Sequence, residues 1–342
     1  MINKMKSVIR RNGFYIDLGT ENTLIYGRGQ GWVLNEPSFV TFNEKKNNRV
    51  LMALGRTSKS HLGRNPQNIK VERPLHEGVI ADFFATESML RGFFNSLNIG
   101  SSILKSDMII SLPCLVTQFE RRAVEEVGQS LGAKKVHLLD EPMAAAVGSG
   151  LPVMAPRGQI IVDIGGGTTE IAIISLGGVA YSTAVRIGGH SMDQRIMQHL
   201  RHRFNILIGE TTAEKLKINF ADALNSDPFE MIKFNGIDLS TGLPRRIELS
   251  KSEISFAINP ILDDIVASIN VALASAEPEL SADISEQGIW LAGGGALIKN
   301  FSKKIELSTG LKVNIARDPL FSVARGGAYL LEHPELLEKL AV

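Results

Sequence analysis

Two copies of one short motif constrain the fold of this chain more than any other feature. Residues 160–171 read IIVDIGGGTTEI, a β-branched apolar run that ends at an aspartate and turns through glycine and threonine. Residues 15–25 read YIDLGTENTLI, and alignment of Asp17 with Asp163 also aligns the glycines that follow. Each copy predicts a buried strand, a tight turn and a second strand. The spacing is too long for a solenoid repeat and indicates two similar halves.

Both turns have the composition of a phosphate-binding loop. Glycines let backbone N–H groups approach an anion closely, and threonine hydroxyls supply further donors. Asp17 and Asp163, at the strand ends, are placed to hold a hydrated Mg²⁺, a hard cation that prefers oxygen ligands. Either turn alone has a plain glycine hairpin as its alternative. Two loops that face each other would clamp a polyphosphate from both sides, and this pairing is the more specific signal.

Composition narrows the class of protein. The 342 residues suffice for two domains, and 37 Lys and Arg nearly balance 36 Asp and Glu, so nothing indicates a nucleic-acid partner. The single cysteine, Cys114, excludes an internal disulfide, fits a reducing cytoplasm and is predicted to be a buried, inert thiol. The histidines lack metal-ligand spacing, and no apolar run approaches the ~20 residues of a membrane span.

The remaining pattern predicts helices separated by strands and turns. Residues 82–97, 191–204, 211–220 and 253–276 have helical spacing, 32–80 read as a small insertion of short strands, and 225–242 read as polar, turn-rich surface. A glycine triplet, Gly293–Gly295, follows a predicted strand and would admit a flat ligand against the backbone.

Glu120 has two interpretations. Thr117 opens a predicted helix, and Thr117 with Glu120 three residues later forms a capping box. Near a nucleotide cleft, the same carboxylate would orient an attacking water. The residues alone favour the cap.

Two segments are candidates for contact with a membrane. On a helix over residues 1–11, apolar side chains share one face and basic ones the other, which is typical of an amphipathic helix on an anionic membrane. A solvated N-terminus is the alternative. Residues 98–105 form a Gly/Ser-rich loop whose apolar side chains would contact a membrane or partner if exposed, and would be core if tucked inward. The apolar residues concerned are Ile2, Met5, Val8, Ile9, Ile103 and Leu104.

The combination of Asp-Leu-Gly-Thr, Asp-Ile-Gly-Gly-Gly-Thr-Thr and Ala-Gly-Gly-Gly resembles the three-part signature of the actin, sugar-kinase and heat-shock-chaperone ATPase superfamily. Within it, the chain closely resembles the MreB family of bacterial rod-shape actins. Segments that match in order span nearly the whole chain, among them GVIADF, ERRAVEEVG, DEPMAAAVGSGLPV and LAGGGALIKNF.

The resemblance implies an α/β, actin-like (ribonuclease H-like) duplicated fold, with two domains of two subdomains each around a central nucleotide cleft. The implied divisions are a first half over 1–145 with an insertion at about 32–80, a second half over 146–315 with an insertion at about 188–248, and C-terminal helices over 316–342 that return to the first half.

The resemblance also implies roles for individual residues. The cofactors would be ATP or ADP with Mg²⁺, and the metal would be held at Asp17 and Asp163. Glu120 matches the residue thought to activate water, with Thr168 assisting. The nucleotide contacts would be Thr20, Glu21, Asn22, Gly165, Gly166, Gly167, Thr168, Glu214, Lys217, Gly293, Gly294, Gly295, Ala296 and Leu297. Ile103 and Leu104 match a two-residue apolar membrane loop of the family.

Two residues depart from the family pattern. The first loop normally reads Gly-Thr-Ala-Asn, and here Glu21 replaces the alanine. A carboxylate beside a triphosphate repels it unless the side chain points outward or pairs with a cation. His190 stands where the family usually has an acidic residue.

The function implied is that of an ATP-dependent, weakly hydrolysing filament former. It would lie in the cytoplasm on the inner face of the cell membrane and guide cell-wall synthesis. Its partners would be further copies of itself in paired protofilaments, the anionic membrane surface and the cell-wall elongation machinery, with no nucleic acid. The alternatives are a plasmid- or organelle-positioning bacterial actin and a soluble metabolite kinase of the same fold.

Overall fold

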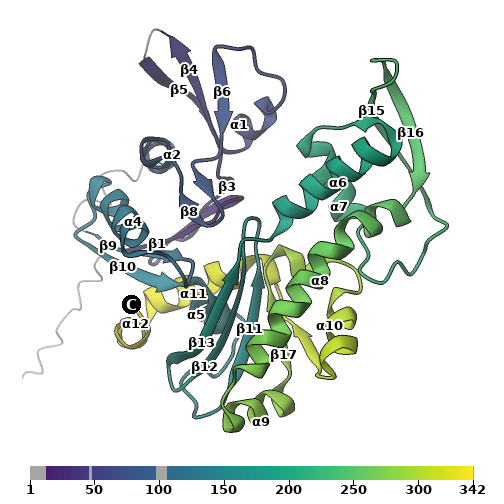
Figure 1. Ribbon diagram of the computed structural model, residues 1–342. Helices are drawn as coiled ribbons and strands as arrows, with labels where there is room; N and C mark the ends of the chain where they lie inside the picture. Colours follow the sequence, from purple (N-terminus) through teal and green to yellow (C-terminus); the bar gives the residue numbers. More distant parts are fainter. Residues whose placement is uncertain (1–12, 46–47, 98–105, 342) are drawn as a thin grey trace, which may run out of the picture.

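The computed structural model describes residues 13–45, 48–97 and 106–341. Two five-stranded sheets form its framework (Figure 1). The first has the order β10-β9-β1-β2-β3, with strands Lys135–Asp140, Asp107–Leu112, Gly13–Leu18, Asn22–Gly27 and Gly31–Pro37. The second has the order β13-β12-β11-β17-β18, with strands Gly178–Val185, Thr169–Ser175, Gln159–Ile164, Ile289–Ala292 and Val313–Ile315.

The two motif copies occupy equivalent places in the two sheets. Strands β1 and β2 pair antiparallel up to Leu18 and Thr23, and β11 and β12 pair antiparallel up to Ile164 and Thr169. Each first strand also has a parallel neighbour, β9 in one sheet and β17 in the other. The predicted strand, turn and strand of both copies and the duplicated α/β fold are therefore confirmed.

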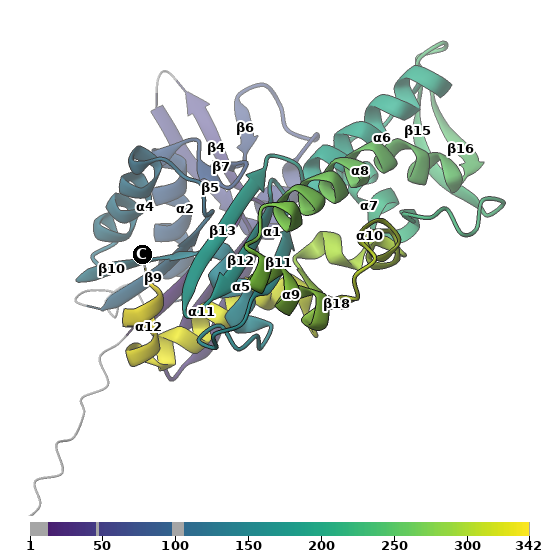
Figure 2. The same ribbon diagram turned by 60° about the horizontal axis from the view of Figure 1, so that its bottom comes forward.

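Helices pack against these sheets, between them and beside the smaller sheets (Figure 2). They are α1 Gly55–His61, α2 Phe83–Ser96, α4 Gln118–Ser130, α5 Glu141–Gly148, α6 Gly189–Phe204, α7 Glu210–Phe220, α8 Ser252–Ala274, α9 Pro278–Gln287, α10 Phe301–Thr309, α11 Ser322–Glu332 and α12 Pro334–Leu340. Short 3₁₀ turns span Gly294–Leu297 (η1) and Pro319–Phe321 (η2). The helices predicted from spacing over 82–97, 191–204, 211–220 and 253–276 are confirmed within about two residues.

Three small sheets lie outside this framework. They are β5-β4-β6 with strands Asn48–Leu54, Val40–Lys45 and Ile69–Glu72, then β14-β15-β16 with strands Ile206–Leu207, Met231–Asp238 and Pro244–Ser250, and the pair β7 Leu75–His76 and β8 Val79–Ile80. Strand β3 extends the first large sheet, so the separate small sheet of the 32–80 region starts only at Val40.

The prediction of polar, turn-rich surface over 225–242 is wrong for its central part. Residues Met231–Asp238 form strand β15, which pairs with β16 along seven residues of register. Ile232 is buried and Phe234 half-buried, while Met231 and Lys233 are exposed. This alternation places one face of the strand against the core, and the polar residues between hid it in the sequence.

A core shared by both halves holds the two large sheets together. It contains Tyr15 from β1 and Ile161 from β11 together with helices α5 and α11. These helices cross so closely that a Cβ at Gly326 would lie 1.8 Å from the carbonyl oxygen of Ala144, and one at Gly148 would lie 1.8 Å from that of Ser322. Glycine is therefore required at both crossing positions, and the crossing fixes how the halves meet.

Helix α8 is long and apolar enough that, by length and composition, it could span a membrane, which the search for apolar runs in the sequence did not indicate. Its buried residues, which include Ile258, Leu262 and Ile265, belong to the core of the second half. Only 39% of the most apolar window of α8 is buried, which by itself leaves a membrane span open. However, α8 also carries two exposed charged residues, Asp263 and Asp264. A core helix of a globular domain passes the same test, and the packing favours that interpretation.

Candidate functional site

The two glycine turns face each other where the halves meet. A Cβ at Gly167 would lie 2.9 Å from the Cα of Glu77 and 3.1 Å from Oγ1 of Thr20, and one at Gly166 would lie 3.1 Å from the Cβ of Glu21. The Thr20 hydroxyl oxygen accepts a hydrogen bond from the backbone N–H of Gly78 at 2.9 Å. The fold thus brings together two loops that are far apart in sequence, with little space for side chains between them.

Asp17 and Asp163 lie at the ends of β1 and β11, beside these loops. Asp163 is buried, and Asp17 accepts a hydrogen bond from the Ser111 hydroxyl at 3.2 Å. Burial raises the pKa of both carboxyls to about 7, and the charge of Asp17 adds to the shift at Asp163. The two predicted metal-holding residues therefore share one low-dielectric region, where a cation would favour their charged forms.

Two further carboxylates join this region, and sequence reasoning missed both. Burial raises the pKa of Glu170 to about 8, and its Oε1 accepts a hydrogen bond from the Cys114 N–H at 2.9 Å. Burial also raises the pKa of Glu141 well above its usual value, with further contributions from the charges of Glu170, Asp17 and Asp163. We call Asp17, Glu141, Asp163 and Glu170 the acidic cluster.

The acidic cluster has the chemistry of a site for a hydrated divalent cation. Oε2 of Glu170 is buried without a hydrogen-bond partner among the described residues. Within that same part of the chain, no three acidic, histidine or cysteine side chains converge as direct metal ligands. Mg²⁺ usually keeps several of its waters and takes one or two protein carboxylates, so the donors present fit it.

A signal for the missed carboxylates was present in the sequence. Asp140 ends β10 and Glu141 directly follows it, and β10 runs parallel to β9, which runs parallel to β1. Carboxyl ends of parallel strands meet at one edge of a sheet, so a Glu after β10 was a candidate for the same site as Asp17. Glu170 directly follows the second glycine turn, but nothing local distinguished a core position from a cleft position there.

The third glycine cluster packs against the second loop. Strand β17 lies beside β11, with Ala292 opposite Asp163. A Cβ at Gly293, whose φ is +75°, would lie 2.5 Å from the Asp163 carboxylate, and one at Gly295 would lie 2.1 Å from the Ile164 side chain. The cluster continues into η1, which contains Gly294, Ala296 and Leu297. These predicted nucleotide contacts therefore adjoin the acidic cluster.

Glu21 does not stand as an unpaired charge in the first loop. It forms ion pairs with Lys59 of α1 at 2.5 Å and Arg73 at 3.6 Å, and His190 of α6 donates to it at 2.6 Å. Burial alone would raise the pKa of Glu21, but the His190 hydrogen bond and Lys59 outweigh it and lower the pKa to about 2. Glu21 thus pairs with cations, which is one of the two arrangements that sequence reasoning required for a carboxylate at this position.

The two predicted adenosine-contacting residues of α7 belong to the same neighbourhood. Glu214 forms an ion pair with Lys59 at 3.1 Å. Lys217 donates to the Gly189 carbonyl and pairs with Asp193, both at 2.8 Å. Asn22 begins β2 with an exposed side chain. These contacts link α7 to the start of α6 and to α1 across the cleft.

Glu120 has a structural contact in this fold. Its carboxylate accepts hydrogen bonds from the backbone N–H and hydroxyl of Thr117, at 2.6 and 2.7 Å, which completes the capping box of α4. The cap predicted from spacing is confirmed, whereas the catalytic roles of Glu120 and Thr168 remain predictions. Cys114 is half-buried, and burial with the nearby Glu170 charge raises the pKa of its thiol, which disfavours a nucleophilic thiolate.

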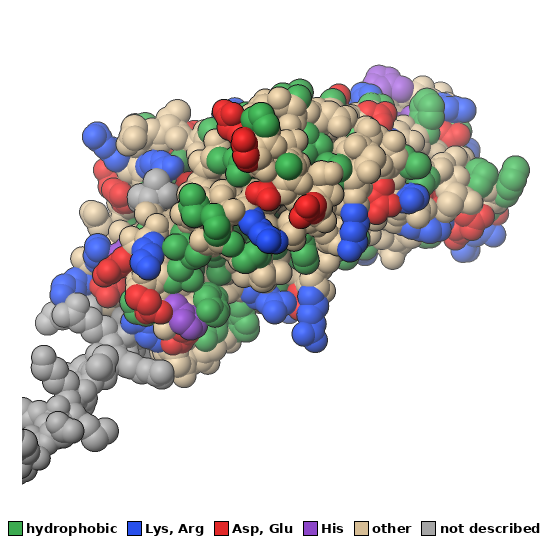
Figure 3. Space-filling view, turned by 90° about the horizontal axis from the view of Figure 1, so that it is seen from below, with side chains coloured by type: hydrophobic (Ala, Val, Ile, Leu, Met, Phe, Trp, Pro, Cys, Tyr) green, Lys and Arg blue, Asp and Glu red, His purple; other side chains and the backbone are tan. Residues whose placement is uncertain are grey.

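The six predicted membrane-contacting residues lie outside the described residues. The strands that follow their segments start side by side, because Gly13 of β1 is in register with Asp107 of β9. The surface seen from below mixes charges of both signs with apolar and neutral side chains, in keeping with the balanced composition (Figure 3).

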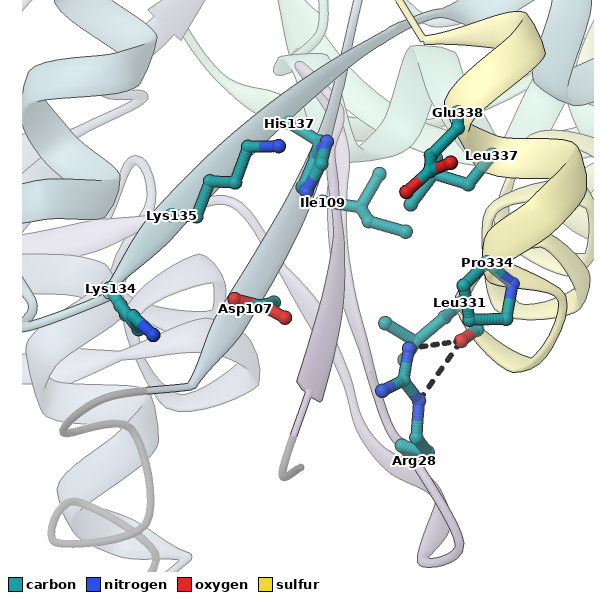
Figure 4. A pocket seen from close by; sticks show the side chains of 10 residues that line it. All are labelled: Arg28, Asp107, Ile109, Lys134, Lys135, His137, Leu331, Pro334, Leu337 and Glu338. Carbon is teal, nitrogen blue, oxygen red and sulfur yellow. Dashed lines mark hydrogen bonds between the residues drawn. The ribbon is translucent and has the colours of Figure 1, made fainter. Parts of the chain in front are cut away.

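A separate pocket of about 280 Å³ lies beside α12, at the start of the β9 and β10 strands. Its lining includes Asp107, Lys135 and Glu338, and Arg28 there donates to the carbonyl of Leu331 (Figure 4). None of the residues predicted from the sequence to bind nucleotide or metal lines this pocket.

The nucleotide-free protein is expected to lose stability as pH rises from about 4 to 7. The folded-state pKa values of Asp17 and Asp163 are raised from 3.8 to about 7, so the folded state binds more protons than the unfolded state in this interval. Each group lowers the free energy of unfolding by at most roughly 4 kcal/mol at high pH, since one pKa unit corresponds to about 1.4 kcal/mol. Urea unfolding across this range measures the slope. Asp163→Asn should flatten it, and an unchanged slope would contradict the assignment.

Comparisons with known proteins place the chain among bacterial actins. The family model described as MreB/Mbl protein matches residues 11–339. The chain is 46% identical over 335 residues to the cell shape-determining protein MreB of Escherichia coli K12, covering 97% of this chain and 96% of that one. It is 39% identical over 324 residues to the cell shape-determining protein Mbl of Bacillus subtilis, covering 95% and 97%.

Comparison with solved structures agrees with these sequence matches. MreB5 of Spiroplasma citri bound to AMPPNP superposes with a TM-score of 0.90 at 34% identity, over 95% of this chain and 97% of that one. A MamK double helical filament superposes with a TM-score of 0.78 at 22% identity, over 94% and 99%, and at that identity shows a shared fold only.

Proposed function

This chain belongs to the MreB/Mbl protein family, and we propose that it is an ATP-dependent cytoskeletal protein that forms membrane-associated filaments and maintains cell shape. Its relatives over nearly the full length are cell shape-determining proteins. Its structural neighbours include MreB5 bound to AMPPNP and to ADP, and MamK in a double helical filament. The observation that carries the proposal is the pair of facing glycine loops beside the acidic cluster.

The loops and the glycine cluster would bind the nucleotide. Backbone N–H groups of Gly166 and Gly167 and the hydroxyls of Thr20 and Thr168 would be the donors for phosphate oxygens, while the Gly165 N–H closes the turn by donating to the Thr168 carbonyl at 2.9 Å. Gly293 to Gly295 with η1, and α7 with Glu214 and Lys217, would flank the adenosine. Because these groups come from both halves, a bound nucleotide would favour the closed arrangement of the chain over an open one.

The members of the acidic cluster would have two different roles, metal binding and water activation. Mg²⁺, when bound, would neutralise phosphate charge, and Asp17 and Asp163 would hold its water shell. We assign the water-orienting role to Glu141, with Thr168 assisting, because Glu141 lies in the electrostatic field of both aspartates. The sequence-based candidate Glu120 remains to be tested against it.

The main test is electron microscopy of the protein with ATP and Mg²⁺ on an anionic lipid monolayer. Filaments that need both nucleotide and metal are the expected result. Phosphate release measured with and without added sugars separates a filament former from a metabolite kinase. Stimulation by a sugar, with no filaments under any condition, would contradict the proposal.

Deletion of residues 1–11 is expected to abolish flotation with anionic liposomes while ATP-dependent pelleting in solution persists. The expectation rests on the amphipathic pattern of residues 1–11. It also rests on the strands that follow the two candidate segments, because these strands start side by side at Gly13 and Asp107. The double variant Ile103→Ser/Leu104→Ser, made in the chain that retains residues 1–11, should weaken flotation without abolishing it. Leu307→Ser, an exposed leucine on α10, is the matched control and should float like the parent. Full flotation of the deletion variant would exclude the helix as the anchor.

A further inference from the structure

The two residues that depart from the family pattern contact each other. Nε2 of His190, on the first turn of α6, donates to Oε2 of Glu21 in the first loop at 2.6 Å. A carboxylate only accepts, so this ring nitrogen carries a proton. The bond joins the first half of the chain to the second, at positions 169 residues apart.

The contact lies against the second phosphate loop. A Cβ at Gly166 would be 3.1 Å from the Cβ of Glu21 and 3.6 Å from Cε1 of His190. Both side chains therefore adjoin the backbone that is proposed to bind phosphate. A charge on either one acts on an anion held there, because the surroundings are mostly protein and screen it little.

Glu21 forms ion pairs with more than one cationic side chain. Lys59 and Arg73 pair with it from the first half, and each also pairs with α7, at Glu214 and Glu210 respectively. The charged groups around His190 are Glu21, Lys59 and Arg73 on one side, with Glu214 and Lys217 of α7 and Asp193 of its own helix on the other. The network of charged groups around Glu21 and His190 therefore contains four carboxylates even when no phosphate is bound.

We propose that Glu21 and His190 form a specificity-determining pair that sets the preference of the cleft between a nucleoside triphosphate and a diphosphate. The inference rests on the proposed function, since it requires nucleotide binding at the paired loops. The carboxylate of Glu21 pairs with Lys59 and Arg73, which would otherwise attract phosphate. It also adds a negative charge beside the second loop. The triphosphate carries more negative charge than the diphosphate and is disfavoured more. A protonated His190 offsets this charge and restores preference for the triphosphate.

The direction in which nucleotide affinity changes with pH follows from the charge of the His190 imidazole. A histidine gains its positive charge as pH falls through the neutral range. Affinity for MgATP, relative to MgADP, should therefore rise as pH falls. By linkage, a charged imidazole that favours MgATP requires that MgATP binding takes up protons. Asp193, whose pKa burial raises to about 6 against the opposing effect of Lys217, titrates nearby, so a variant must separate the two groups.

The experiment is isothermal titration calorimetry of MgATP and MgADP with the parent, Glu21→Gln, His190→Asn and the double variant, at about pH 6 and pH 8. Each is repeated in two buffers of different ionisation enthalpy, which reports proton uptake on binding. Glu279→Gln, an exposed carboxylate on α9, is the matched control. Thermal unfolding of each variant verifies the fold; Glu21→Gln keeps the size of the side chain and removes its charge, and His190→Asn removes the ionisable ring and leaves a shorter polar side chain.

Glu21→Gln should tighten MgATP binding on the order of tenfold and MgADP clearly less, as expected for one charge at short range. His190→Asn should weaken MgATP binding at pH 6 by about fivefold, flatten the pH profile and reduce proton uptake. The double variant should reveal coupling for MgATP that exceeds the coupling for MgADP. Equal effects on the two nucleotides, or an unchanged pH profile in His190→Asn, would overturn this inference alone. A parent that binds neither nucleotide would overturn the proposed function and the inference with it.

Discussion

Replacement of Asp163 by alanine or asparagine is expected to abolish filament assembly with ATP and Mg²⁺. Asp163 is buried at the end of β11, it adds its charge to that of Asp17, and the Gly293 backbone packs against its carboxylate. Without this charge, a cation shared with the phosphates loses one of its two predicted carboxylate partners. Pelleting and negative-stain microscopy measure assembly, and phosphate release should fall by at least about a hundredfold.

The loss should occur without unfolding. Because burial raises the pKa of Asp163 to about 7, its charged form destabilises the nucleotide-free protein above that pH. Asp163→Asn should therefore be as stable as the parent at pH 8, or more stable. Asp264→Asn, on the exposed face of α8, is the matched control and should assemble normally. An Asp163→Asn protein that pellets and hydrolyses ATP like the parent would reject the two-loop clamp.

Replacement of Glu141 by glutamine is expected to reduce phosphate release by roughly a hundredfold or more, the usual range for loss of a general base. Assembly with ATP should persist, because the glycine loops and both aspartates remain. Filaments of this variant should also be longer-lived, since hydrolysis would no longer convert the bound nucleotide. A phosphate-release assay and the rate of filament disassembly after ATP depletion measure the two effects.

The matched comparison is Glu120→Gln. Its carboxylate caps α4 through two bonds to Thr117, and glutamine can occupy the same capping position. This variant should hydrolyse ATP like the parent and lose at most about 1 kcal/mol of stability. If Glu120→Gln stops hydrolysis and Glu141→Gln does not, the sequence-based candidate is correct and the assignment drawn from the structure is wrong.

Local pattern was sufficient for the elements that carry the site. Both glycine turns, the helices over 82–97 and 253–276 and the capping box at Thr117 were predictable, because each depends on residues close in sequence. The strand over Met231–Asp238 was missed, since its alternation is weak without knowledge of the core it faces. The resemblance to a family then supplied the arrangement of the two halves, which no local pattern contains.

The sequence by itself determined that two loops and two aspartates recur in the halves of one chain. Only the tertiary structure decided which charges surround them. Glu141 and Glu170 join the aspartates because strand ends from both sheets converge, and His190 donates a hydrogen bond to Glu21 across 169 positions of sequence. Ionic contacts of this kind depend on distances between remote residues, and those distances are set by packing of the two sheets around α5 and α11. Two departures that appeared independent in the sequence are therefore one interaction in the fold.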